Sequence, residues 1–334
     1  MKRIISLILI LSALIVSLAS CKRNPPDTAP GAVNISALKT HDDVQSLIIS
    51  GSIDIAILPE PKATVAINTA KQEGLNYFIA LNLSNEWSGI SDYPLTMGCL
   101  AVNNNSLNQK EGEINAFLSL YKTSIEYIND SSNHEDAANM ILNAGILPKL
   151  PIAKSALTNL YGSIVYKDGE DMKESLKSFY SAINIDQPSD SFYYKGGNPS
   201  QSIENKLVIG VMNGPTGMGM AKLINDVKDN ANYEFRMYTT PETAIVDLKS
   251  GELDLACLPT NAVANASNKG MPISVAAINT LGSLYVVVKE GITIKSVNDL
   301  IGKTVYYGVP TSTTEPIFRY ILTQNGIEVN ILDE

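Results

Sequence analysis

The feature of this 334-residue sequence that most constrains its fold is an internal match at an offset of 200 positions. Residues 40–59 read THDDVQSLIISGSIDIAILP, and residues 240–259 read TPETAIVDLKSGELDLACLP. Each copy opens with a threonine suited to cap a helix and with acidic residues where the helix dipole favours them. Apolar residues at helical spacing, a Ser-Gly pair and a buried run ending at Leu-Pro follow. Each copy therefore predicts a helix, a glycine turn and a buried strand.

The segments around each copy repeat the alternation of strand and helix. Residues 207–211 and 304–308 read as strands that lead through polar loops into helices. Residues 273–279 and 77–82 read as further strands, whereas 106–185 is mostly helical in pattern. Strands alternating with helices predict two α/β lobes with mainly parallel sheets. In such lobes, ligands bind beyond the carboxyl ends of the strands.

The first 32 residues predict export and a lipid anchor. A basic pair precedes an apolar run, residues 4–18. As a helix this run is about 22 Å long, which is too short for a hydrocarbon core of ~30 Å. It ends at Leu-Ala-Ser-Cys21, which resembles the bacterial lipobox, in which the cysteine is acylated. We expect residues 1–20 to be a lipoprotein signal peptide and residues 21–32 a lipidated tether; ordinary secretion, with Cys21 incidental, is the alternative.

Composition argues against several function classes. The formal net charge of −9 becomes −11 once the basic pair of the signal peptide is removed, and no basic cluster remains, so nucleic acid is not an expected partner. Neither histidine, His41 or His134, has a neighbour at ligand spacing, so no metal site is predicted. Cys99 and Cys257 lie in apolar runs and are predicted to be buried side chains rather than a disulfide.

The motifs resemble the solute-binding proteins of ABC importers for nitrate, taurine or sulfonate and for thiamine precursors. The resemblance rests on the doubled Ser-Gly-x-x-Asp-x-Ala-x-Leu-Pro pattern and on shorter matches at residues 94–98, 190–195, 209–219, 277–282 and 302–305. It implies a type II periplasmic-binding-protein-like α/β fold of two lobes joined by a two-strand hinge. It also implies a monomer without enzymatic activity or cofactor, on the outer face of the cytoplasmic membrane, with permease and ATPase subunits as partners.

The order of the segments departs from the family pattern. The part that resembles the family's first half, residues 204–334, follows the part that resembles its second half, residues 33–195. We therefore expect a circular permutation joined through a linker at residues 196–202. The family's fold would place residues 33–98 and 295–334 in one discontinuous lobe, residues 103–290 in the other, and the hinge in strands 97–102 and 285–289.

The resemblance places ligand contacts in the loops at the carboxyl ends of the strands of both lobes. Hydroxyl and amide side chains there, with the free N–H groups of helix starts, suit a small polar ligand. The predicted contacts of one lobe are Asn213, Gly214, Thr216, Gly217, Thr260, Asn261 and Asn279, and those of the other are Glu60, Trp87, Thr311, Ser312 and Thr313. Local roles are the alternatives: Asn213 closing a turn, Thr216 and Ser312 capping helices (Ser312 in a capping box with Glu315), Glu60 stabilising a helix start, and Trp87 anchoring a surface loop.

Charge favours one ligand class. The predicted loops contain Glu60 and neither Lys nor Arg, which favours a cationic or amine-bearing heterocycle, such as a thiamine-precursor-like pyrimidine, over a sulfonate- or nitrate-type anion. The alternatives to a transport protein are an extracellular sensor or adhesin lipoprotein of the same fold, a permuted biosensor scaffold and an enzyme. Against the enzyme, the sequence contains no nucleophile elbow, Cys–His pair or Gly-rich phosphate loop.

Overall fold

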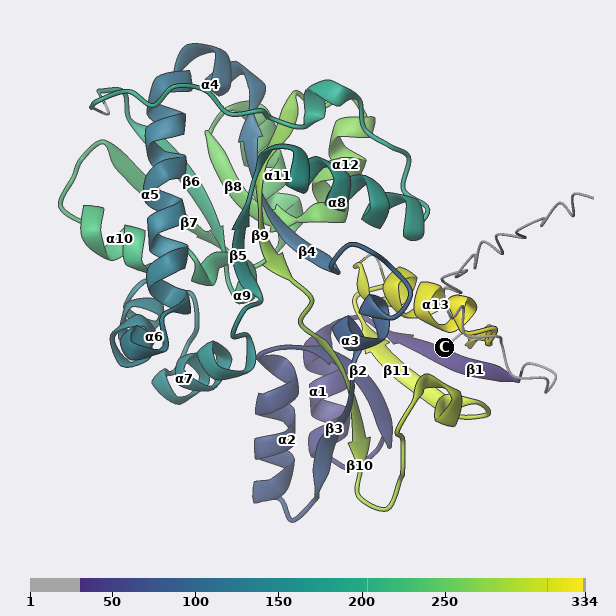
Figure 1. Cartoon of the computed structure of the whole chain (residues 1–334). Helices are drawn as coiled ribbons and strands as arrows, with labels where there is room; N and C mark the ends of the chain where they lie inside the picture. Colours follow the sequence, from purple (N-terminus) through teal and green to yellow (C-terminus); the bar gives the residue numbers. More distant parts are fainter. Residues whose placement is uncertain (1–30, 203, 311, 333–334) are drawn as a thin grey trace, which may run out of the picture.

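The computed structural model describes residues 31–202, 204–310 and 312–332. The predicted signal peptide, Cys21, most of the predicted tether and Thr311 lie outside the described residues. The described chain forms two α/β lobes, each built on one six-stranded sheet (Figure 1). We call them the terminal lobe, residues 31–90 and 284–332, and the central lobe, residues 96–281. The predicted two-lobed α/β class is confirmed.

The sheet of the terminal lobe has the strand order β12-β1-β11-β2-β10-β3. Its strands are β1 (Ala32–Leu38), β2 (Ile55–Pro59), β3 (Tyr77–Asn82), β10 (Leu284–Lys289), β11 (Thr304–Gly308) and β12 (Glu328–Leu332). One face packs against α1 (His41–Ile49) and α2 (Lys62–Gln72), and the other against α3 (Leu83–Ser88) and α13 (Thr314–Gln324). A short 3-10 helix, Val297–Leu300, precedes β11.

The sheet of the central lobe has the order β5-β9-β4-β8-β6-β7. Its strands are β4 (Thr96–Asn103), β5 (Ile164–Lys167), β6 (Leu207–Met212), β7 (Tyr233–Tyr238), β8 (Leu255–Pro259) and β9 (Ile273–Leu281). One face packs against α5 (Glu111–Asn129), α6 (His134–Asn143), α7 (Leu150–Asn159) and α10 (Ala221–Val227), and the other against α8 (Gly169–Ala182), α11 (Pro241–Ser250) and α12 (Thr260–Asn268). Helices α4 (Asn104–Gln109) and α9 (Pro215–Met218) and two 3-10 turns, Ser131–Asn133 and Asp190–Phe192, complete it.

Most strands of each sheet run in one direction, as predicted, but each sheet also contains antiparallel strands. In the terminal sheet β10 runs antiparallel to β2 and β3, and in the central sheet β4 runs antiparallel to β8 and β9. Each of these strands enters its sheet from the other lobe. A strand that arrives at the carboxyl edge of a sheet continues in the opposite direction to the strands that end there.

The lobes are joined where the described chain crosses between the sheets, through α3 and residues 89–95, and through Gly282–Ser283 (Figure 1). β10, which the predicted 103–290 lobe included, pairs in the terminal sheet. The difference arises because residues 273–289 form a nearly continuous apolar run, and periodicity alone does not show where such a run changes sheet. The chain passes from one sheet to the other at Gly282. A side chain does not fit at this position, because a Cβ there would lie 1.9 Å from Ser84 Oγ.

Both repeat units form the predicted helix, glycine turn and strand. Thr40 caps α1 in a reciprocal box with Asp43, in which Thr40 Oγ1 accepts from Asp43 N at 3.0 Å and Asp43 Oδ2 accepts from Thr40 N at 2.9 Å. α11 begins instead with Pro241 at its first turn and has no side-chain cap bond. Gly51 and Gly251 both adopt left-handed φ values, +72° and +84°. Cys99 and Cys257 are free and buried, as predicted.

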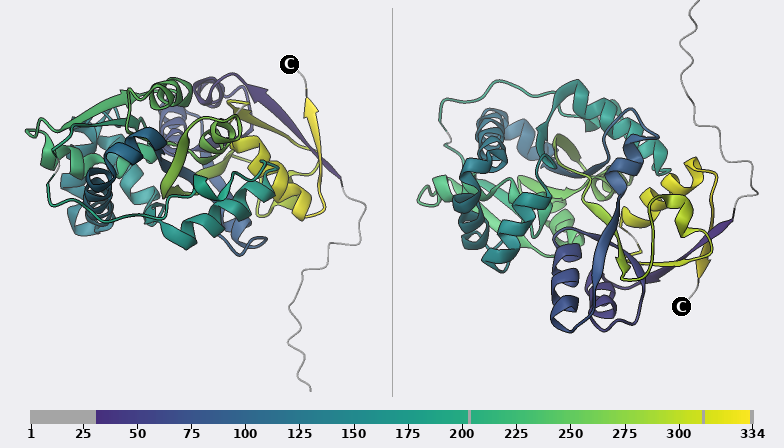
Figure 2. Two further views of the ribbon diagram at one scale, coloured as in Figure 1. Left: turned by 90° about the horizontal axis from the view of Figure 1, so that it is seen from above. Right: turned by 60° about the horizontal axis from the view of Figure 1, so that its bottom comes forward.

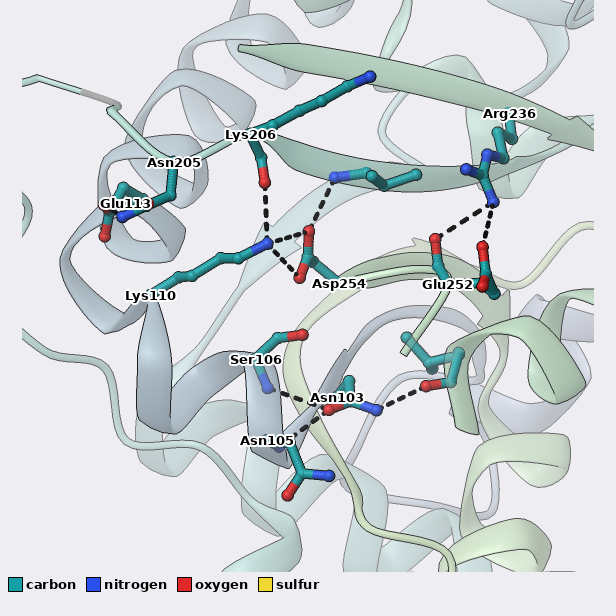
Figure 3. A network of polar contacts seen from close by, with 12 residues as sticks. Asn103, Asn105, Ser106, Lys110, Glu113, Asn205, Lys206, Arg236, Glu252 and Asp254 are labelled. Carbon is teal, nitrogen blue, oxygen red and sulfur yellow. Dashed lines mark hydrogen bonds and ion pairs between the residues drawn. The ribbon is translucent and has the colours of Figure 1, made fainter. Parts of the chain in front are cut away.

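The repeat is not symmetrical at its aspartates. Asp254 is buried at the start of β8 and accepts hydrogen bonds from Lys110 Nζ at 2.9 and 3.0 Å and from Val208 N at 2.9 Å (Figure 3). Lys110 also donates to Lys206 O. This contact fastens β6 and the α4–α5 turn to β8, at the end of the sheet away from Pro259. Asp254 therefore has a local structural role, whereas Asp54 is exposed and its Oδ1 lies 3.7 Å from Lys289 Nζ.

Candidate functional site

The carboxyl ends of the two sheets face each other along one seam. Gly282–Ser283 connects the end of β9 directly to the start of β10, and β10 begins opposite the end of β2, with Leu284 paired to Pro59. β4 begins at the same place, with Thr96 paired to Leu281. The loops after β2, β11, β6 and β8 therefore meet along this seam, where ligands bind in open α/β sheets.

On the central side, glycines let the α9 loop lie close to β4. A Cβ on Gly98 would come within 2.7 Å of Asn279 Oδ1 and 2.9 Å of Thr216, and a Cβ on Gly217 within 2.1 Å of Met212 O. Gly214 has a φ of +98°. The helical segment after β6 is interrupted, because α9 ends at Met218 and α10 starts at Ala221. Asn213, ahead of α9, is exposed, and its N–H donates to Tyr238 O.

Asn279 holds this loop from behind. Its side chain is 1% exposed, its Nδ2 donates to Thr216 O at 3.2 Å, and its Oδ1 accepts from Thr280 Oγ1 at 3.0 Å. We predicted Asn279 as a ligand contact. Both ends of its amide are hydrogen-bonded within the protein, so Asn279 positions the start of α9, and its contact with a ligand stays a prediction.

The start of α12 contains an acceptor without a partner. Thr260 is fully buried, and its carbonyl accepts from Tyr180 Oη at 3.2 Å. The side chain of Asn261 is 7% exposed, and its Oδ1 is buried with no hydrogen-bond partner among the described residues. Thr96 Oγ1 is in the same state. Asn261 is therefore an unsatisfied acceptor in the first turn of a helix at the seam. This state is unusual, because buried polar atoms are nearly always hydrogen-bonded.

On the terminal side, Glu60 joins the lobes. It is 1% exposed, and its Oε1 accepts from Thr64 Oγ1 at 2.7 Å and from Asn159 Nδ2 of α7 at 2.9 Å. Its Oε2 accepts from Thr64 N at 3.2 Å. Tyr285 Oη donates to Asn159 O at 3.4 Å, and burial, followed by the charge of Glu60, raises the pKa of Tyr285. No Lys, Arg or His of the described chain forms an ion pair with Glu60.

The start of α13 also contacts the other lobe. Thr313 is 5% exposed, and its Oγ1 lies 3.8 Å from Met97 Sδ in β4. The predicted capping box of Ser312 with Glu315 does not form, because the helix begins at Thr314 and Glu315 pairs with Arg319. Ser312 Oγ instead accepts from Thr314 N at 3.3 Å.

Trp87 lies inside the hinge. Its ring packs against Phe179 of α8 at 5.8 Å and against Tyr320 of α13 at 5.0 Å between centroids, and its Nε1 donates to Tyr93 O at 2.9 Å. With 1% of its surface exposed, it is neither a surface-loop anchor nor free to stack on a ligand in this arrangement. It contacts both lobes and so reports on their relative position.

Asn159 and His41 are among the residues at the seam that sequence reasoning missed. Asn159 ends α7, and no local pattern distinguishes it, because its partner lies 99 positions away. His41 is the first residue of α1, and its Nδ1 is buried without a hydrogen-bond partner among the described residues. Burial, then the charge of Lys62, lowers the pKa of His41 to about 4. Its position as the first residue of α1 follows from the Thr40 cap, but the burial of its Nδ1 does not.

Other features of the described chain lie away from the seam. A hollow of about 260 Å³ lies between α5 and the predicted linker, and none of the predicted site residues lines it. The linker runs along α5, with Gly197 N donating to Asn115 Oδ1 and Ser200 N to Gly112 O, each at 2.9 Å. No group of three or more potential metal ligands occurs among the described residues. In the same part of the chain, no helix has both the length and the hydrophobicity needed to cross a membrane.

Comparison with known families gives one match. Residues 218–333 match the model of a family described as "ABC transporter, phosphonate, periplasmic substrate-binding protein". The matched region runs from the central lobe across Gly282–Ser283 into the terminal lobe, and it includes Asn261, Ser312 and Thr313 but not Glu60. No curated protein matches the chain.

Several solved structures of low identity align with most of the chain. A binding protein of an ABC phosphonate transporter from Pseudomonas aeruginosa is 11% identical, covers 81% of this chain and 72% of its own, and has a TM-score of 0.36. Substrate-binding domain 2 of GlnP from Lactococcus lactis, in an open conformation, is 10% identical, with coverages of 90% and 92% and a TM-score of 0.31. The GluR0 ligand-binding core with L-glutamate is 8% identical, with coverages of 90% and 98% and a TM-score of 0.33.

Proposed function

We propose that this chain is the extracytoplasmic solute-binding component of an ABC importer, a monomer that captures a small polar molecule between its lobes and delivers it to permease and ATPase subunits. The family match over residues 218–333 supports the transport class. The observation that carries the binding role is the seam, where buried polar groups of both lobes meet and Glu60 of one lobe bonds to Asn159 of the other. In this proposal Cys21 carries the lipid anchor that holds the protein at the outer face of the membrane.

We further propose that the segment order is circularly permuted. Two observations support this. The linker at residues 196–202 is an exposed connection along α5, as expected of a segment that connects the former ends of the chain after a permutation. β12 and β1, the strands nearest the two ends of the described chain, belong to the same sheet, so both ends fall in one lobe, as the unpermuted order requires (Figure 2).

For the ligand we propose a molecule with a cationic or N–H-rich face, such as an aminopyrimidine related to thiamine precursors. The seam contains the Glu60 carboxylate, which has no cationic partner among the described residues. It also contains Asn261 Oδ1 and His41 Nδ1, which have no hydrogen-bond partner among those residues. Lys62 is near His41, but it is already paired with Asp42. Buried charges are stabilised by pairing, so a donor on the ligand complements this edge. A phosphonate, the ligand class in the family's description, is the alternative.

A thermal-shift screen tests the proposal. The mature chain with Cys21→Ser is unfolded, refolded to remove carried ligand, and screened with aminopyrimidines, alkylphosphonates with and without an amino group, alkanesulfonates and nitrate. A ligand at 100 times its Kd stabilises the native state by about 2.7 kcal/mol. We expect a rise in Tm with a probe that bears an amine. A rise only with phosphonates lacking the amine would overturn the ligand class, and no rise with any probe from a cooperatively folding sample would overturn the binding role.

A further inference from the structure

The terminal sheet contains the same three residues twice, side by side. β1 contains Val33-Asn34-Ile35, and β12 contains Val329-Asn330-Ile331. The two strands are parallel, and the register pairs each residue with its identical counterpart. Asn330 Nδ2 donates to Asn34 Oδ1 at 3.2 Å. The strands lie next to each other at one edge of the molecule in both views of Figure 2.

The two copies differ in how much of their apolar surface is buried. Neighbouring residues of a parallel pair in register project to the same face. Val33 and Ile35 are 0% and 1% exposed, in the cluster that includes Ile317 and Phe318 of α13, whereas Ile331 is 57% exposed. β12 therefore has the core pattern of β1 in a place that leaves Ile331 largely in solvent.

The chain path also favours a different position for β12. Consecutive strands joined by a helix are usually neighbours in the sheet, yet β1 lies between β11 and β12, with Asn34 paired to Thr304 and Ile35 to Val305. The connection from α13 to β12 is the short segment 325–327. Adjacent strands are about 4.8 Å apart, so β12 lies one strand spacing from the position beside β11.

We propose that β12 is a spare copy of β1 that takes the place beside β11 when β1 leaves the sheet. In this second form Asn330 pairs with Thr304, and Ile331 occupies the buried position of Ile35. β1 leads through Thr40 into α1, and a Cβ on Gly308 would come within 2.6 Å of Thr40 and of His41 N. Release of β1 therefore loosens the start of α1 at the seam, while β12 fills the position beside β11 and leaves no gap in the terminal sheet. The proposal does not depend on the identity of the ligand.

Two cysteine pairs distinguish the forms. The pair Asn34→Cys with Thr304→Cys reports β1 beside β11, and the pair Asn330→Cys with Thr304→Cys reports β12 there. In the present form residues 330 and 304 are two strand spacings apart, about 9.6 Å, beyond the reach of about 7 Å between the Cα atoms of a disulfide. Both pairs are made with Cys21→Ser, and the natural Cys99 and Cys257 are buried.

The exchange is provoked by Ile35→Asp, which removes β1 from the core, and the matched control is Ile331→Asp, the same change in the exposed copy. We expect the 330–304 pair to change from mostly reduced to mostly oxidised in the Ile35→Asp background and to stay reduced with Ile331→Asp. Hydrogen exchange covers the case in which Ile35→Asp unfolds the lobe. The amides of β11 should keep their protection with Ile35→Asp and lose it only in the Ile35→Asp, Ile331→Asp double variant. Loss with Ile35→Asp alone, or a reduced 330–304 pair in a folded variant, overturns the proposal.

Discussion

Oε1 of Glu60 accepts a hydrogen bond from Nδ2 of Asn159 at 2.9 Å, and this bond joins the terminal lobe to the central lobe. The carboxylate is buried and is bonded only to neutral donors, Asn159 and Thr64, among the described residues. The hydrogen bonds of this carboxylate hold the lobes together, and its negative charge attracts a cation. Neutralising the carboxylate therefore distinguishes its effect on a charged ligand from its effect on the stability of the fold.

Glu60→Gln should therefore weaken the binding of an amine-bearing ligand much more than it changes the free protein. A hydrogen bond to a charged group contributes about 1.5–3 kcal/mol, so we expect Kd to rise about 10- to 100-fold. Calorimetric titration of the amine-bearing probe that raises Tm provides the measurement. Asp54→Asn is the matched control, because Asp54 precedes β2 in the same lobe but is exposed and away from the seam. Equal affinity in Glu60→Gln and the parent would remove Glu60 from the ligand site.

Asn261 and Asn279 should respond in opposite ways to the same substitution. Asn261→Leu removes an unsatisfied buried acceptor, so the free protein should keep its stability or gain about 0.5–1 kcal/mol, while ligand affinity falls. Asn279→Leu breaks the bonds to Thr216 O and Thr280 Oγ1 and should cost about 2–3 kcal/mol. Urea unfolding checks both. If Asn261→Leu destabilises the protein as much as Asn279→Leu, then Asn261 has a structural partner and its amide is not reserved for a ligand.

His41 should make stability depend on pH. Burial lowers the pKa of His41 to about 4 in the folded chain, below its ordinary value of 6.5. Between these values the unfolded chain binds more protons, so the free energy of unfolding is greatest above pH 6.5 and falls as pH decreases toward 4. The full difference is roughly 3 kcal/mol at 1.36 kcal/mol per pKa unit. His41→Leu should flatten the curve across this window. A curve in His41→Leu as steep as the parent's would contradict this assignment.

The parts of the fold that sequence predicts well are those whose signals are local. Thr40 with Asp43, and the glycines at 51 and 251, fix the ends of two helices within a few residues, and both repeat units form as expected. The antiparallel entry of β4 and β10 was not predicted, because strand direction depends on where the chain changes lobe, and the apolar residues on either side of Gly282 are alike.

The candidate site was predicted only at the level of loops. Sequence placed Glu60, Asn261, Asn279 and Thr313 at the carboxyl edges of strands, where the structure has them. It did not distinguish Asn279, whose amide is used within the protein, from Asn261, whose Oδ1 is not, because that difference depends on Gly98 admitting Asn279 and Thr216 to close contact. Asn159 was missed because its only role visible in the structure is a contact with the other lobe.

The central claim is that the lobes close on a small ligand, and Trp87 tests it most directly. It is the only tryptophan of the chain, and it packs between Phe179 of the central lobe and Tyr320 of the terminal lobe. The measurement is a titration of the refolded chain with the amine-bearing probes, followed by Trp87 fluorescence. We predict a saturable change in emission with a probe that also raises Tm, and a higher midpoint concentration in Glu60→Gln. Unchanged emission and unchanged Tm with every probe of the panel, in a protein that unfolds cooperatively, would contradict the account.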